Sequence, residues 1–146
     1  MTLRWFDLIT PSTLQLAPLL ELLLEPIRCA RLQQQVQLGL QEVLVNAVRH
    51  GNGSDPCKTV RIRRIESPHW WIWQVQDQGD GLPHAARCGR LPEQCDATGG
   101  RGLFLIHQCF DDVRWSRRGN RLQLAVARER RQADLFSGGG LGSLDR

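Results

Sequence analysis

The sequence has no apolar run long enough to cross a membrane, which takes about 20 residues in a helix. Its most apolar stretch, LAPLLELLLEPI, is interrupted by Pro18, Glu21, Glu25 and Pro26. The first residues, MTLRWFDLIT, lack the basic and long apolar segments of a signal peptide. We therefore expect a cytoplasmic protein that is not inserted in a membrane.

Paired CxxC motifs are also missing, and the number of cysteines is odd. The five are Cys29, Cys57, Cys88, Cys95 and Cys109. His84 together with Cys88 and Cys95 is the one group to consider for zinc, but its spacing matches no familiar ligand pattern. We expect free thiols in a reducing cytosol.

Lysine is nearly absent, because Lys58 is the only one and arginine supplies almost all the positive charge. The net charge of +4 suits an anionic ligand or an acidic partner. A long basic run interleaved with aromatic residues is missing, and RERR near the C-terminus is short. We therefore predict no direct contact with nucleic acid.

Several nucleotide-binding motifs are absent as well. The sequence contains no GxxxxGK[ST], which excludes a P-loop, and no GxGxxG that opens a helix after a first strand. The HRD and DFG motifs and the third-strand lysine of the common protein kinases are missing too. A nucleotide site, if present, has to be of another kind.

The length of 146 residues corresponds to about one domain. Alternating apolar residues predict strands at 3–9, 59–65, 70–77, 112–116 and 121–127, and three- and four-residue spacing predicts helices at 13–27, 31–50 and 103–110. This order predicts an α+β fold, a two-layer sandwich with helices on one face of a mostly antiparallel sheet. We expect PST at 11–13 to cap the first helix and Gly51 to cap the end of the second.

The tail from residue 129 is polar and rich in glycine. Such a composition buries too little apolar surface to fold, so we expect disorder in residues 129–146. The predicted folded domain is residues 1–128.

The predicted second helix carries a polar stripe in EVLVNAVRHG. Glu42, Asn46 and His50 follow one another at four-residue intervals and therefore lie on one side of a helix. An amide and a carboxylate are what a divalent cation and a proton-accepting step require. The solvent face of an amphipathic helix would show the same spacing, and periodicity alone does not decide between these interpretations.

A second motif, VQDQGDGLP, follows the strand at 70–77. Asp77 closes this apolar strand, and Gly79 and Gly81 allow the backbone to approach a ligand closely. A carboxylate in such a place suits recognition of an amino group on a flat heterocycle. Taken alone, the motif is equally typical of a hairpin turn.

The third motif is TGGRGLFLI, in which Gly99, Gly100 and Gly102 lead into a helix. A glycine-rich turn before a helix exposes unpaired N–H groups and the positive end of the helix dipole, which favours phosphate. Arg101 would add charge-assisted contacts. A flexible hinge is the alternative for this stretch.

In this order, ExxxNAxxHG, DxGxG and GRGL resemble the GHKL ATPases, the superfamily of gyrase, MutL and the histidine kinases. The resemblance covers roughly residues 3–127. The residues of the three motifs are most similar to those of the small anti-sigma-factor serine/threonine-protein kinases. The resemblance implies a Bergerat-type ATP-binding fold that uses ATP and Mg²⁺.

The resemblance also implies roles for the residues that match. Glu42 would be the general base, Asn46 would hold Mg²⁺, and Asp77 would accept a hydrogen bond from the adenine amino group, with Gly79 and Gly81 shaping that pocket. The phosphates would lie against Gly100, Arg101, Gly102 and Leu103 at the helix start. Such a sparse set is chemically sufficient because phosphoryl transfer relies on positioning and charge neutralisation.

The sequence departs from the family pattern at one position near the adenine. Many relatives carry threonine where Asn120 follows Gly119, and asparagine can also form a hydrogen bond there. Residues 83–99 would form a short lid. We expect His50 to pack or to line the pocket rather than to transfer protons.

The implied function is a kinase that phosphorylates a small anti-anti-sigma protein of the STAS fold and also sequesters a sigma factor. The alternative is a non-catalytic GHKL module that uses nucleotide only as a conformational ligand. The presence of both Glu42 and Asn46 favours the enzyme, because a pure binder needs neither. Relatives are often dimers, so a homodimer is a further expectation.

Overall fold

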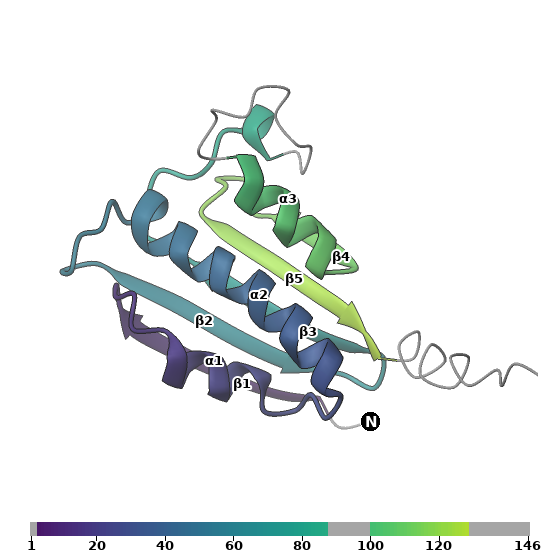
Figure 1. Cartoon of the computed structure of the whole chain (residues 1–146). Coiled ribbons are helices and arrows are strands. Elements are labelled where there is room, and N and C mark those ends of the chain that lie inside the picture. The colour runs from purple at the N-terminus through teal and green to yellow at the C-terminus, as the bar shows by residue number, and fades with distance from the viewer. Residues whose placement is uncertain (1–2, 88–99, 129–146) are drawn as a thin grey trace, which may run out of the picture.

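Figure 1 shows the computed structural model of the chain, which describes residues 3–87 and 100–128. Within these residues, five strands form one antiparallel sheet in the order β1-β2-β3-β5-β4. The strands are β1 (Arg4–Pro11), β2 (Thr59–Glu66), β3 (Trp70–Gln76), β4 (Asp112–Trp115) and β5 (Arg121–Ala127).

The helices lie together on one face of this sheet (Figure 1). They are α1 (Ala17–Leu24), α2 (Ala30–Asn46) and α3 (Gly100–Cys109), with a π-helical turn η1 (Ala47–Gly51) directly after α2 and a short 3₁₀ helix η2 (His84–Ala86). The predicted α+β sandwich, with an antiparallel sheet covered on one face, is confirmed.

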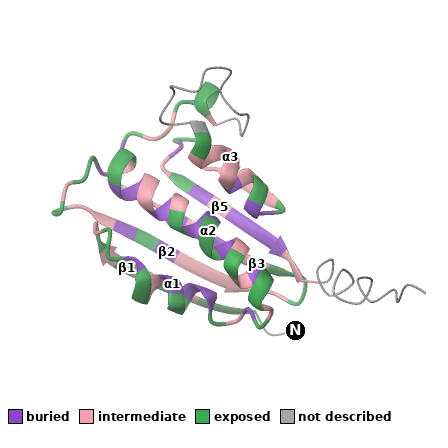
Figure 2. Ribbon diagram, in the orientation of Figure 1, coloured by how far each residue is buried: buried purple, intermediate pink, exposed green. Residues whose placement is uncertain are grey.

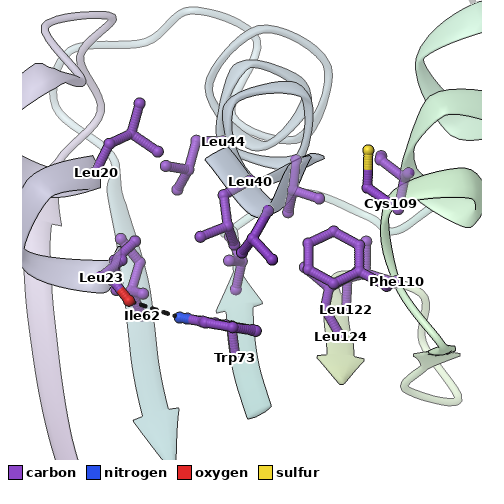
Figure 3. Packing of buried hydrophobic residues seen from close by; sticks show 14 of the residues in the cluster. Leu20, Leu23, Leu40, Leu44, Ile62, Trp73, Cys109, Phe110, Leu122 and Leu124 are labelled. Carbon is purple, nitrogen blue, oxygen red and sulfur yellow. Dashed lines mark hydrogen bonds between the residues drawn. The ribbon is translucent and has the colours of Figure 1, made fainter. Parts of the chain in front are cut away.

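The core lies between the sheet and the helices (Figure 2). Trp73 on β3 is fully buried at its centre, and its Nε1 donates to the carbonyl of Leu23 at 3.1 Å (Figure 3). The Trp73 ring meets Phe110 edge to face, with 6.0 Å between centroids. Leu40 of α2 and Leu124 of β5 are also fully buried. Each such side chain contributes about 1.5–3 kcal/mol, and together they attach the three helices to the sheet.

The predicted start of the first helix is wrong. Helix α1 begins at Ala17 without a side-chain cap, and Pro18 lies in its first turn, where a missing N–H costs nothing. Thr13 instead accepts the N–H of Gln15 at 3.2 Å in a local turn. The Thr13 hydroxyl therefore stabilises the segment that precedes the helix and does not cap the helix N-terminus.

The second helix also ends differently from the prediction. The chain continues beyond Asn46 in the π-helical turn, and the residue that follows this turn is Asn52, with Gly51 inside it. Left-handed backbone occurs later, at Gly53 and Ser54, with φ of 60° and 58°. Gly51 is therefore not the helix cap.

Helix α3 begins at Gly100 rather than at residue 103, so GRG forms its first turn instead of preceding it. Most of the predicted lid, residues 88–99, lies outside the described residues, as do Cys88, Cys95 and the tail at 129–146. Cys29 and Cys57 are free thiols, and Cys109 is buried. None of the helices within the described ranges has the length and apolar character needed to span a membrane.

Candidate functional site

A cavity of about 510 Å³ lies between α2, η1, α3 and the loops that follow β3 and β4. Six predicted site residues line it, namely Asn46, Asp77, Gly79, Gly81, Leu103 and Asn120. The volume falls within the range of small-molecule sites, roughly 300–1,000 Å³. Four segments that are distant in the sequence therefore meet at one cavity.

Glu42 and Asn46 lie on the side of α2 that faces the first turn of α3. A Cβ placed on Gly102 would lie 3.1 Å from Glu42 Oε2 and 3.6 Å from Asn46 Nδ2, so a larger side chain there would crowd both groups. The first N–H groups of a helix have no partner within it and carry partial positive charge. A carboxylate, an amide and a helix start are thus brought together.

Glycine also allows the two helices to come this close. A Cβ on Gly39 would lie 2.7 Å from Cys109 Cβ and 2.5 Å from the Phe110 ring. One turn earlier on α2, Gln35 Nε2 donates to the carbonyl of Cys109 at 2.9 Å. The side chain of Arg101 is exposed and is not among the residues that line the cavity, so its phosphate role stays a prediction.

Asp77 lies just beyond the end of β3, with its carboxyl group against Gly51, where any Cβ would overlap it. Burial raises the pKa of the Asp77 carboxyl above its ordinary value. The Gly79 N–H donates to Asp77 Oδ1 at 2.8 Å and opposes this rise in pKa, as do the charges of Lys58 and Arg118. A carboxylate that burial disfavours is one that a ligand donor would stabilise.

The two glycines of DxGxG are required by close contacts. A Cβ on Gly79 would overlap the carbonyl oxygen of Gly51, and one on Gly81 would overlap the carbonyl oxygen of Arg118. Gly81 also has a φ of 92°, which favours glycine. The loop after β3 therefore packs directly on η1 and on the turn between β4 and β5.

Asn52 does not line the cavity but supports it, and sequence reasoning missed this residue. It is 1% exposed, and its Nδ2 donates to the carbonyl of Thr59 at 3.0 Å and to Ser12 Oγ at 3.3 Å. Its Oδ1 accepts the N–H of Gln78 at 2.8 Å. Asn52 thereby positions the residue after Asp77, yet in the sequence it looks like any polar residue of the loop NGSDP.

Asn120 lines the cavity and is held by its neighbours. Its Nδ2 donates to the carbonyl of Asp77 at 3.3 Å, and its Oδ1 accepts from Ser116 Oγ at 3.4 Å. Asn120 thus supports the main chain of Asp77 in this structure.

His50 is exposed and lines the cavity, and lining the pocket is one of the two roles expected for it.

The remaining lining residues were also missed. They include Val75, Leu82, Ile106, Trp115 and Leu122, with the polar Lys58, Gln78 and Asp80. Apolar side chains that line a hollow have the same spacing as those that fill a core, so the sequence carries no signal that separates them.

A comparison with protein-family models matches residues 16–126 to the histidine kinase-like ATPase domain. The comparison with curated proteins gave no match. The matched range contains all three motifs, the strands β2, β3 and β4, and β5 except its last residue. The chain therefore belongs to the histidine kinase-like ATPase domain family, within the GHKL superfamily.

Proposed function

We propose that this chain is an ATP-dependent serine/threonine-protein kinase of the anti-sigma-factor type. It would phosphorylate a STAS-type anti-anti-sigma protein and sequester a sigma factor in the cytoplasm. The observation that supports catalysis is the approach of Glu42 and Asn46 to the first turn of α3, beside the cavity that contains Asp77. The choice of partners rests on the resemblance of the three motifs to the small anti-sigma-factor kinases.

The described residues fit ATP and Mg²⁺. Asp77 offers an acceptor for the amino group of the base, and the N–H groups that begin α3 offer donors for phosphate. The amide oxygen of Asn46 is a hard ligand suited to Mg²⁺. The metal ion would neutralise charge on the phosphates when bound.

Glu42 would accept the proton of the attacking serine hydroxyl. A new bond would form between the hydroxyl oxygen and the γ-phosphorus, and the bond from that phosphorus to the β–γ bridging oxygen would break. ADP leaves with the bridging oxygen. A module that only binds nucleotide has no use for a base at this position, which favours the enzyme.

The experiment compares Asn46→Ala, Glu42→Gln and a control, Gln41→Ala, which changes an exposed neighbour on the other side of α2. We expect Asn46→Ala to abolish Mg²⁺-dependent ATP binding in calorimetry. Glu42→Gln should still bind ATP but transfer phosphate from radiolabelled ATP to the partner about 100-fold more slowly, the usual effect of a general base.

Three results would contradict the proposal. Equal ATP affinity of wild type and Asn46→Ala, with no effect of EDTA, would remove the site assignment. Full phosphate transfer by Glu42→Gln would show that Glu42 is not the general base. The absence of any transfer by the wild type would contradict kinase activity and favour a module that only binds nucleotide. Capture of partners from the source cell with and without ATP shows whether they are a sigma factor, a STAS protein or neither.

A further inference from the structure

Arg87 connects two segments that are about 30 residues apart in the sequence. Its Nε donates to the carbonyl of Leu82 at 2.9 Å, in the loop after β3. Its Nη1 and Nη2 donate to the carbonyls of Ser116 and Arg117, both at 3.3 Å, in the turn between β4 and β5. The guanidinium carbon lies 6.0 Å from the centroid of the Trp115 ring.

The same two segments form one wall of the cavity. Leu82 lines it from the first segment, and Trp115, Gly119 and Asn120 line it from the second. The segments also share main-chain bonds, from the N–H of Leu82 to the carbonyl of Gly119 and from the N–H of Asp77 to the carbonyl of Asn120, both at 3.0 Å. Arg87 adds three hydrogen bonds to carbonyl groups of these two segments.

The guanidinium packs directly on the turn. Gly119 has a φ of 83°, and a Cβ there would overlap Nη2 of Arg87 as well as approach the carbonyl of Leu82. Arginine suits this position because its planar fork offers several donors in fixed directions, whereas lysine offers a single point charge. The contact therefore depends on both residues, Arg87 and Gly119.

We infer that Arg87 is a positioning residue, which sets nucleotide affinity by holding the wall formed by Leu82 and residues 115–120 in place. The inference rests on the proposed function for its ligand. A wall that is already ordered loses less conformational freedom when a ligand binds, so affinity is higher. Arg87 acts through carbonyl groups of the wall and not through the phosphates.

The test uses Arg87→Lys, which keeps the charge and loses the fork. Arg114→Lys is the matched control, because Arg114 is exposed on β4 and donates to Asp112 at 2.7 Å. In the protein without ligand, we expect the Leu82 amide to exchange its hydrogen at least tenfold faster in Arg87→Lys. Calorimetry should show about tenfold weaker binding of both adenosine and a Mg²⁺-loaded non-hydrolysable ATP analogue.

The control variant should match the wild type in both measurements. Unchanged exchange at Leu82 in Arg87→Lys, or a tenfold change in Arg114→Lys, overturns the inference. A loss confined to the ATP analogue also overturns it, because Arg87 would then act on the phosphates. If the wild type binds no nucleotide, the proposed function fails, and hydrogen exchange alone decides whether Arg87 holds the wall.

Discussion

Helix α2 presents polar residues at helical spacing on two of its sides, and the two sides have different neighbours. Gln35, Gly39, Glu42 and Asn46 face α3, whereas Gln33, Gln37, Gln41 and Val45 line a broad groove beside α1. The first side makes close contact with another helix and carries the candidate chemistry. The second leaves a hollow of about 830 Å³.

The two sides of α2 differ in packing because of the helices next to them more than because of α2 itself. On the α3 side, Gly39 lets Cys109 and Phe110 come into contact with the backbone, so α3 brings its first turn to Glu42. On the α1 side, Gln33 Nε2 donates to the carbonyl of Ile27 at 3.4 Å and to that of Leu24 at 3.5 Å, and a groove remains between the two helices. A polar stripe acquires a role when a partner element approaches it.

The largest effect should come from Gly39→Leu, which forces α2 and α3 apart. Overpacking at this contact should lower the free energy of unfolding by about 3 kcal/mol. It should also abolish ATP binding, because Gly102 would move away from Glu42. Urea unfolding and calorimetry measure the two effects.

The control for this change is Gln37→Leu, in which the same side chain is introduced on the exposed side. It should leave stability within about 0.5 kcal/mol of the wild type. Equal effects of the two leucines would show that the two sides of α2 do not differ in packing.

A smaller effect is expected from Gly51→Ala, which tests whether the α3-facing side continues past α2 to Asp77. The new Cβ would displace the Asp77 carboxyl group, so stability should fall by about 2 kcal/mol, with weaker ATP binding. In an Asp77→Ala background the same substitution should cost clearly less stability. Identical costs in both backgrounds would show that the two residues are not coupled.

The smallest effect is expected from Gln35→Ala, which removes the hydrogen bond to the carbonyl of Cys109 on the α3 side. The free energy of unfolding should fall by about 1 kcal/mol. Gln37→Ala, with the same change in helix propensity, should differ little from wild type. If both glutamines prove equally dispensable in thermal unfolding, the hydrogen bond from Gln35 to Cys109 contributes nothing to stability and α2 is held against α3 by packing.

Periodicity predicted much of the architecture. The five strands and the three helices follow from alternation and from three- and four-residue spacing, and they lie in the described residues close to where they were expected. The errors are at helix ends. Thr13 and Gly51 have the residue types of caps, but neither caps a helix. Thr13 accepts a hydrogen bond in a local turn before the helix, and Gly51 leaves room for the Asp77 carboxyl group, a contact between segments distant in sequence.

The candidate site was only partly predictable. Glu42, Asn46 and Asp77 stand out because polar groups are unusual beside apolar stripes and strand ends. Asn52 and Arg87 do not stand out, because each acts through carbonyl and amide groups of segments that are remote in the sequence. Their roles in ligand binding stay predictions.

By itself, the sequence determined the order of strands and helices, the α+β class and the three motifs, because these depend on the order of apolar, polar and glycine residues along the chain. Only the tertiary structure decided which side of α2 would face α3, why a side chain at Gly51 would overlap Asp77, and why Gly102 lies so close to Glu42. It also decided that Arg87 would meet the turn before β5. These features depend on distances between segments, and such distances are settled only when the helices pack on the sheet.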